Sequence, residues 1–217
     1  MNAPSLRGKK ILITAGPTWV PIDDVRVISN TSSGELGFLL AREAVSCGMR
    51  TDLFLGPATH ADSPQGARVA RFKYFDELLK LISRTLTRRR YDLILHCAAV
   101  SDYLMEPVEG KISSKNEQLI LRLRPAPKLV DLMRRLNPGA FLVMFKLEGR
   151  VSDAVLLKRA LEAKKRASAD LVVANRFQDG RYRGFILGSS DVLARSESKA
   201  GLVRSLFKIL KEKTANI

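Results

Sequence analysis

The sequence predicts an α/β fold built on a mainly parallel sheet. Short apolar runs without polar alternation, such as Ile11-Leu12-Ile13, are typical of strands buried on both faces. Amphipathic stretches with apolar residues at helical spacing separate these runs nearly throughout, which favours parallel pairing through crossover helices. With 217 residues, 46% of them hydrophobic, the chain is long enough to bury the core of a single domain, expected over 1–217.

The first half of the chain should contain four strands and two helices. Gly48 is expected to stop the first helix, because glycine readily adopts the left-handed conformation that ends many helices. The second helix ends in Arg88-Arg89-Arg90, which suits the negative end of a helix dipole and is interpreted first as a solvated helix end. The expected strands are 9–14, 51–55, 67–72 and 91–96, the expected helices are 34–47 and about 75–90, and 58–66 should be a loop.

The second half continues this alternation after a polar segment. Residues 104–118 have the composition of a mobile flap. We then expect a strand exposed on one face at 119–124, a helix opened by Pro125-Ala126-Pro127 and ending near 136, a strand at 140–145, a helix capped by Ser152 and ending near 167, a strand at 170–175, a short antiparallel extension at 184–187 and 192–194, and a closing helix around 202–210. Together these elements predict a Rossmann-like, mainly parallel sheet with helices on both faces and a small antiparallel extension.

The chain is strongly basic, with 37 Lys and Arg against 22 Asp and Glu and a formal net charge of +15. Nucleic acid, small anionic substrates and a merely soluble basic surface are all compatible with that charge. Nucleic acid is the least favoured, because only 6% of the residues are aromatic and they do not alternate with arginines.

Composition also bears on where the protein works. No run of about 18 apolar residues predicts a membrane span, and the N-terminus lacks the apolar segment of a secretory signal. Cys47 and Cys97 are the only cysteines, which indicates free thiols in a reducing compartment, so a cytoplasmic protein is expected. Two dispersed cysteines and two dispersed histidines give no zinc spacing, and His96, in an apolar strand, is interpreted as a core histidine.

Small and polar residues gather where the expected strands end. The carboxyl ends of parallel strands lie along one edge of a sheet, so these segments can converge on one crevice. A lysine on the flap can then close over that crevice, which is the arrangement of a nucleotide site with a mobile cation. The segments are Gly16 with Asn30, Ser32, Ser33 and Gly34; Ala98 to Asp102; Phe145 to Glu148 with Asn175; and Lys111 on the flap.

Each of these signals also has a plainer structural interpretation. Gly16-Pro17-Thr18 is a common turn, Ser32-Ser33-Gly34 can simply cap a helix, Lys111 alone would be a solvated lysine, and Asp102 can pair locally. An NAD(P)-dependent oxidoreductase is a rival for such a fold. It is not favoured, because the first turn lacks GxGxxG, and no Walker-type GxxxxGK[ST] occurs either.

Taken together, the motifs resemble phosphopantothenate–cysteine ligase, the phosphopantothenoylcysteine synthetase of coenzyme A biosynthesis. The length leaves no room for the decarboxylase domain fused to many bacterial versions, so the stand-alone form is expected. The resemblance runs from about Lys9 to the C-terminus and rests on Ile13 to Thr18, Pro21-Ile22-Asp23, Val25 to Gly34 with Gly37, Ala98 to Tyr103, Lys111-Ile112, Phe145 to Glu148 and Val173-Ala174-Asn175.

The resemblance implies roles for individual residues. Asn30 and Lys111 would be catalytic, and Asn30 would contact phosphopantothenate together with Ala98 and Ala99. The nucleotide would lie against Gly16, Ser32, Gly34, Gly37, Asp102, Pro127, Lys128, Leu129, Val130, Phe145 and Asn175. The resemblance also implies Mg²⁺ with CTP or ATP, without deciding between them, a homodimer, and a separate phosphopantothenoylcysteine decarboxylase that acts on the product.

Several positions depart from the family's motifs. Pro17, Trp19-Val20 and Arg176 replace the usual residues. The basic residues of 158–166 do not align cleanly, so Lys158, Arg159, Lys164 and Lys165 are only candidates for nucleotide contacts. These departures leave two alternatives open: a divergent relative with an altered substrate, or a non-catalytic or NAD(P)-linked Rossmann-like nucleotide-binding protein.

Overall fold

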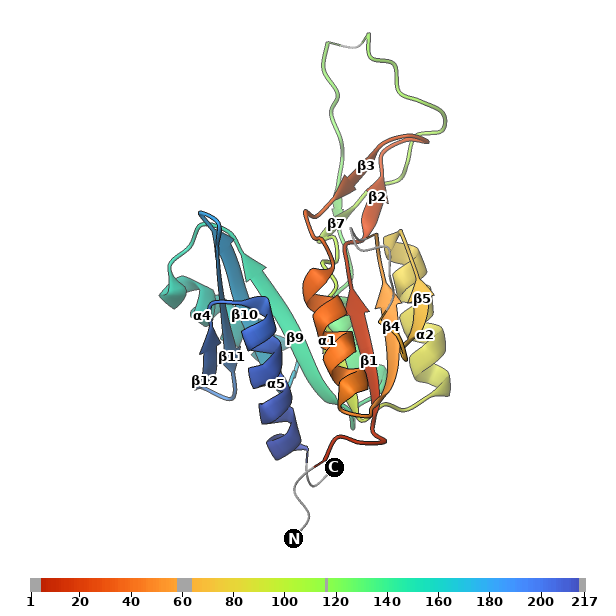
Figure 1. Ribbon diagram of the computed structural model, residues 1–217. Coiled ribbons are helices and arrows are strands. Elements are labelled where there is room, and N and C mark those ends of the chain that lie inside the picture. Colours follow the sequence, from red (N-terminus) through yellow and green to blue (C-terminus); the bar gives the residue numbers. More distant parts are fainter. Residues whose placement is uncertain (1–4, 58–63, 116, 215–217) are drawn as a thin grey trace.

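An eight-stranded sheet forms the centre of the fold in the computed structural model, which describes residues 5–57, 64–115 and 117–214 (Figure 1). Six neighbouring strands are parallel, in the order β10-β9-β6-β1-β4-β5, and β11 and β12 continue the sheet antiparallel beyond β10. The predicted fold class is therefore confirmed. The strand bounds are β1 Lys10–Ala15, β4 Arg50–Leu55, β5 Arg68–Arg71, β6 Leu93–His96, β9 Phe141–Glu148, β10 Leu171–Gln178, β11 Arg181–Leu187 and β12 Val192–Ser196.

Helices cover both faces of this sheet, as the unalternating apolar strands predict. In β1, Ile11 and Ile13 pack in one core cluster and Leu12 packs in another, because successive side chains point to opposite faces. Helices α1 (Glu35–Ser46) and α5 (Lys199–Lys213) close the first cluster. Helices α2 (Phe75–Arg88), α3 (Leu129–Leu136) and α4 (Asp153–Arg166) close the second. Gly48, at a φ of 73°, follows α1 as predicted.

The strand order reverses between β1 and β6. From β1 the chain builds outward through β4 and β5, and it then returns to β6 on the other side of β1. In open α/β sheets, ligands bind outside the carboxyl ends of the strands at such a reversal. The topology therefore directs attention to the loops that follow Ala15 and His96.

A projecting arm rises from this edge of the sheet (Figure 1). Within the described residues it consists of the hairpin β2 (Trp19–Pro21) and β3 (Val27–Ser29) together with 104–115 and 117–123, most of which belong to the flap. The Val108 N–H donates to the Ile22 carbonyl at 2.9 Å, and the Asp24 N–H donates to the Gly110 carbonyl at 3.3 Å. The flap is thus tied to a hairpin that the sequence did not predict.

Several expected elements differ in the structure, and the strands expected at 140–145 and 184–187 are each longer than expected. The strand expected at 119–124 is wrong: these residues have no strand partners except Arg124, which pairs with Leu104 where β8 (Arg124–Pro125) meets β7 (Tyr103–Leu104). Pro125 does not open a helix, because the Ala126 N–H is bound to the Asp102 carbonyl, and α3 begins only at Leu129. The strand expected at 170–175 continues to Gln178 because β11 pairs along it. Most of the loop expected at 58–66 lies outside the described residues.

Candidate functional site

The loops after β1 and β6 are joined to each other at the reversal of strand order. The Ala99 N–H donates to the Gly16 carbonyl at 2.9 Å, and the Thr18 N–H donates to the Ala99 carbonyl at 3.2 Å. Gly16 has a φ of 78°, and a Cβ there would lie 3.1 Å from the backbone of Gly56. Glycine is therefore required at the first turn both for its conformation and for this close approach.

Asn30 fastens the next part of the first loop to the same turn. Its Nδ2 donates to the carbonyl of Ala99 at 3.0 Å and to that of Val100 at 3.2 Å. Because both bonds are made by Nδ2, the orientation of the amide is fixed and its oxygen, Oδ1, is the atom free to accept another hydrogen bond. Asn30 itself is exposed, and Oδ1 has no partner among the described residues. The structure thus brings Asn30 next to Ala99, one of the two residues with which the resemblance groups it.

Helix α1 begins beside this turn. Gly34 adopts the left-handed conformation at its N-cap and supplies no side-chain cap. The Ser32 hydroxyl accepts from the Gly34 N–H and the Ser33 hydroxyl from the Glu35 N–H, each at a long 3.4 Å. A helix N-terminus with weakly engaged N–H groups attracts phosphate oxygens.

Gly37, by contrast, serves the packing of α1. A Cβ at Gly37 would lie 2.2 Å from Cβ of Ala15, far inside ordinary contact, so only glycine lets the helix approach β1 this closely. Gly37 is buried. This observation explains the glycine without any ligand.

The segment before α3 also joins the turn after β6. Nζ of Lys128 lies 2.5 Å from a carboxylate oxygen of Asp102, although both side chains are substantially exposed. Such an exposed pair stabilises little and can open to admit a ligand. Leu129 and Val130 are instead buried in the core between α2 and α3, so their side chains belong to the packing.

Phe145 and Asn175 lie on the neighbouring strands β9 and β10, on the face covered by α1 and α5. Phe145 packs against that core cluster, and Val173, its register partner, lies in the same cluster. Asn175, two residues further, therefore faces the same side and is 5% exposed. Neither residue bonds to the turn of Ala98 to Asp102 in the described structure.

Lys111 stands apart on the arm. Its own side chain is exposed, while its neighbour Ile112 is held by two bonds: its N–H donates to the Asp23 carboxylate at 3.1 Å, and its carbonyl accepts from Arg26 at 2.7 Å. Burial opposes the charge of Asp23, but N–H bonds from Val25, Ile112 and Arg26 outweigh it and lower the pKa of Asp23. Within the described residues, no hydrogen bond or ion pair links Lys111 to the other predicted site residues.

The unusual residues of the first loop have structural explanations. The ring of Trp19 packs edge-on against Tyr74, with ring centroids 6.5 Å apart, and the backbone N–H of Trp19 donates to the Lys73 carbonyl. Val20 is 2% exposed, and Pro17 forms a bridge with Ala99. These three residues therefore hold the arm and the turn in place.

Arg176 serves the base of α4. Its guanidinium pairs with Asp153, in the first turn of α4, at 3.0 Å, and donates to the Val151 carbonyl at 2.9 Å. The departure from the family motif at this position is thus accounted for by an ion pair that anchors a helix end.

His96 and Cys97, at the end of β6, both favour their uncharged forms. His96 shares a hydrogen bond of 2.8 Å with Thr14, and burial lowers the pKa of His96 to about 4, which keeps it neutral. Burial raises the pKa of the Cys97 thiol to about 12, which disfavours a thiolate. The interpretation of His96 as a core histidine agrees with this geometry.

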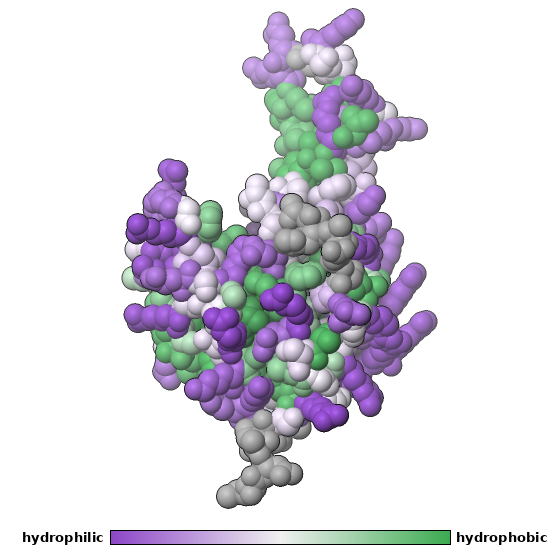
Figure 2. Space-filling model, viewed as in Figure 1, coloured by the Kyte–Doolittle hydropathy of each residue, from purple (hydrophilic) through white to green (hydrophobic). Residues whose placement is uncertain are grey.

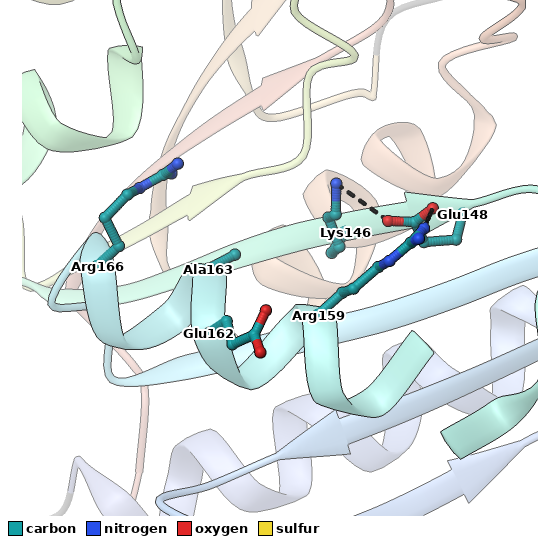
Figure 3. Close-up of a pocket in the computed structure, with 6 residues that line it drawn as sticks. All are labelled: Lys146, Glu148, Arg159, Glu162, Ala163 and Arg166. Atoms are coloured by element: carbon teal, nitrogen blue, oxygen red, sulfur yellow. Dashed lines mark hydrogen bonds and ion pairs between the residues drawn. The ribbon is translucent and has the colours of Figure 1, made fainter. Parts of the chain in front are cut away.

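A separate hollow of about 380 Å³ lies between β9 and α4, on the sheet face opposite Phe145 (Figure 3). Arg159 reaches from α4 to Glu148 at 3.0 Å, and Lys146 pairs with the same carboxylate at 3.3 Å. Of the four basic candidates in 158–166, only Arg159 lines this hollow. Arg159 therefore lies on the face of the sheet opposite α1.

Sequence reasoning missed the side chains that join the two loops. The Thr18 hydroxyl accepts from the Ser101 N–H at 2.9 Å, and the Thr14 hydroxyl accepts from the Ala98 N–H at 3.2 Å. The threonines at and just after the end of the first strand are the feature of the sequence that could have predicted these bonds. In the described ranges, no helix is long and apolar enough to cross a membrane, and no group of three His, Cys, Asp or Glu side chains could hold a metal ion.

Comparisons with known proteins identify the family and the fold of the chain. Residues 6–216 match the family "DNA/pantothenate metabolism flavoprotein C-terminal domain". The chain is 37% identical over 177 residues to the coenzyme A biosynthesis bifunctional protein CoaBC of Thermococcus kodakarensis, covering 81% of this chain and 43% of that protein. The chain spans about half the length of the curated relatives it matches.

Two solved structures share the fold. The DNA/pantothenate metabolism flavoprotein from Streptococcus pneumoniae aligns with a TM-score of 0.83 at 24% identity, covering 95% of this chain and all of that one. A Cab2 mutant in complex with phosphopantothenate-cysteine aligns with a TM-score of 0.79 at 19% identity, covering 96% of this chain and 88% of that one.

Proposed function

We propose that this chain, which belongs to the DNA/pantothenate metabolism flavoprotein C-terminal domain family, is a phosphopantothenate–cysteine ligase of coenzyme A biosynthesis. The observation that carries the proposal is the pair of bonds from Asn30 to Ala99 and Val100 at the reversal of strand order. These bonds join two segments whose motifs resemble the family, the one with Asn30 and the one that begins at Ala98. They do so at the edge of the sheet where such folds bind nucleotides.

The proposed reaction has two steps. The carboxylate of 4'-phosphopantothenate attacks the α-phosphate of a nucleoside triphosphate, which forms an acyl nucleotide and releases pyrophosphate. The amine of cysteine then attacks the acyl carbon, forms the amide and releases the nucleoside monophosphate together with a proton. Both steps need charge neutralisation and positioning more than a strong protein base.

The N-terminus of α1 is the proposed phosphate site. The N–H groups at Gly34 and Glu35 engage hydroxyls only at 3.4 Å, so phosphate oxygens can replace these contacts at little cost. Gly16 lets the triphosphate lie against the backbone of the first turn. Mg²⁺ is proposed to enter bound to the triphosphate, because phosphate oxygens and water are ligands that it prefers. It supplies charge neutralisation there.

Asn30 and Lys111 are proposed to divide the two steps. Lys111, on the arm, would neutralise charge on the reacting α-phosphate when the flap closes. Asn30 would orient the acyl group beside the turn, and its free Oδ1 would accept a hydrogen bond from the amine of cysteine as it attacks. Asp102 and Lys128, now paired with each other at 2.5 Å, would separate and contact the nucleotide, and Phe145 and Asn175 would border it from β9 and β10.

The experiment is pyrophosphate release from phosphopantothenate with CTP or ATP, in the absence and presence of cysteine. Lys111→Gln should block the release, whereas Asn30→Asp should permit a single turnover of release but slow the later consumption of the acyl nucleotide. Lys115→Gln, a charge-matched change on the same flap, should behave like the wild type. Wild-type release by Lys111→Gln would overturn its role, and stabilisation by NADPH but by neither triphosphate would favour the redox alternative.

A homodimer is proposed to form through the arm. Val25, Val108 and Ile120 are 64%, 49% and 80% exposed, and Figure 2 shows apolar side chains gathered along the arm. Apolar surface of this kind is costly in water and is typical of an interface. Sedimentation of the wild type should give a dimer, and Ile120→Lys should shift the mass toward the monomer. A monomeric wild type would refute this part of the proposal.

The surroundings of the reaction follow from its chemistry. The product keeps the carboxylate of cysteine, and we expect a phosphopantothenoylcysteine decarboxylase to remove it. A cytoplasmic location fits this role and the free thiols of Cys47 and Cys97.

A further inference from the structure

A basic hollow lies at the end of the sheet opposite the arm, where the parallel strands begin. Its volume is about 660 Å³, within the range of small-molecule sites. Six cationic side chains line it together with one carboxylate: Lys10, Arg50, Arg68, Arg88, Arg89 and Arg90, with Asp52. The β1 strand separates it from the turn at Gly16 by roughly 20 Å, at about 3.3 Å per residue.

The single lining carboxylate is already neutralised. Arg68 contacts Asp52 through two bonds of 2.6 Å, and Arg89 lies 3.9 Å from it. The hydroxyl of Tyr91 also donates to Asp52. Burial together with this carboxylate raises the pKa of Tyr91, so the hydroxyl remains a donor. Asp52 is therefore already engaged and does not neutralise the other cationic side chains of the hollow.

Four of those cations form no ion pair with a carboxylate in the described part of the chain. Arg90 donates instead to a backbone carbonyl, that of Leu136, and Lys10, Arg50 and Arg88 are exposed. The neighbouring Asp92 accepts from the backbone N–H of Lys10 at 2.6 Å. Lys10 and Arg50 are also direct partners in the pairing of β1 with β4, so their like charges are held side by side.

Helix dipoles explain only part of this cluster. The negative end of α2 accounts for Arg88, in its last turn, and for Arg89 and Arg90, which follow directly. It does not account for Lys10, Arg50 and Arg68, which begin three separate strands. Like charges gathered in a concave site raise the local concentration of anions, and arginines favour phosphate in particular.

We propose that this hollow binds a small, multiply charged phosphate compound at a site separate from the ligase centre. A compact hollow suits a small polyanion better than a nucleic-acid strand, because its one aromatic residue, Tyr91, is 5% exposed and offers no surface for base stacking. The proposal is independent of the ligase function, since it uses none of the residues at the carboxyl edge of the sheet.

The test is a titration of the ¹⁵N-labelled full chain with inorganic tripolyphosphate at about 0.15 M salt. Amide signals of Lys10, Arg50 and Tyr91 should shift with saturable binding. Because the two sites are read from separate amides, shifts at Gly16 or Gly34 report on the ligase site alone. Shifts confined to the carboxyl edge, or a linear and unsaturable response at Lys10 and Arg50, would overturn the proposal.

A charge-matched pair of variants sharpens the test. Arg50→Gln with Arg88→Gln should weaken the binding seen at Lys10 at least about tenfold, since two charge-assisted contacts are lost. Arg204→Gln with Lys208→Gln, on the exposed side of α5, removes the same charge elsewhere. This variant should change the affinity measured at Lys10 less than about twofold. Equal weakening by both variants would show general charge attraction and refute a site.

Discussion

Replacing Gly37 by alanine tests whether this position serves the packing of α1 or the nucleotide. The new Cβ would lie 2.2 Å from Cβ of Ala15, where ordinary contact begins at 3.4 Å. The helix would have to move away from β1 by roughly 1 Å, because neither methyl group can rotate aside. Overpacking of this kind costs up to about 3 kcal/mol, against about 1 kcal/mol gained in helix propensity.

The expected net loss of stability is therefore about 2 kcal/mol. For a domain of this size, that loss should lower the Tm by about 4–8 °C, measured by calorimetry without nucleotide. Ala15→Gly should partly rescue the stability of Gly37→Ala, although the Cα of residue 15 would still lie 3.1 Å from the new Cβ. A double-mutant cycle should give a favourable coupling of at least about 1 kcal/mol.

Two results would refute this reasoning. One is a Tm for Gly37→Ala equal to or above that of the wild type. The other is additivity of the two changes, which would mean that the methyl groups do not meet. A loss of nucleotide affinity at unchanged Tm would instead support the phosphate role that the resemblance implies for Gly37.

Three further predictions concern the arm and the end of β6. Asp23→Asn should speed proteolysis within the flap several-fold, because an amide cannot replace a carboxylate that accepts three N–H bonds, whereas Asp24→Asn should match the wild type. Trp19→Ala should remove the edge contact with Tyr74 and lower the Tm by about 2–4 °C; an unchanged Tm would contradict that packing role. Because burial lowers the pKa of His96 to about 4, the unfolded chain binds more protons between about pH 6.5 and pH 4. The free energy of unfolding from urea titrations should fall as the pH drops through this window, and less steeply in His96→Gln.

The sheet was predictable because its signals are local. Ile11-Leu12-Ile13 is buried on both faces, and each expected parallel strand is present within a few residues. The β2–β3 hairpin was not predictable, because Trp19 to Pro21 is stabilised by Tyr74 and Lys73, far away in the chain. The partial alternation of 119–124 suggested a strand, but a strand also needs a partner edge, and most of this segment has none.

Part of the candidate site was predictable for the same reason. Because β1 and β6 are parallel neighbours, their carboxyl ends lie side by side, and the loops that follow them bring Gly16 next to Ala99. The bonds from Asn30 and the pairing of Asp102 with Lys128 depend on loop conformations that no periodicity encodes. The roles of Lys111, Phe145 and Asn175 remain predictions.

The central claim is tested most directly by detecting the product of the ligase reaction. The chain alone would be incubated with phosphopantothenate, cysteine, Mg²⁺ and either CTP or ATP, and the mixture analysed by mass spectrometry. We predict phosphopantothenoylcysteine with at least one of the two nucleotides, formed in equal amounts with pyrophosphate and the nucleoside monophosphate. A folded protein that yields no such product with either nucleotide would contradict the account.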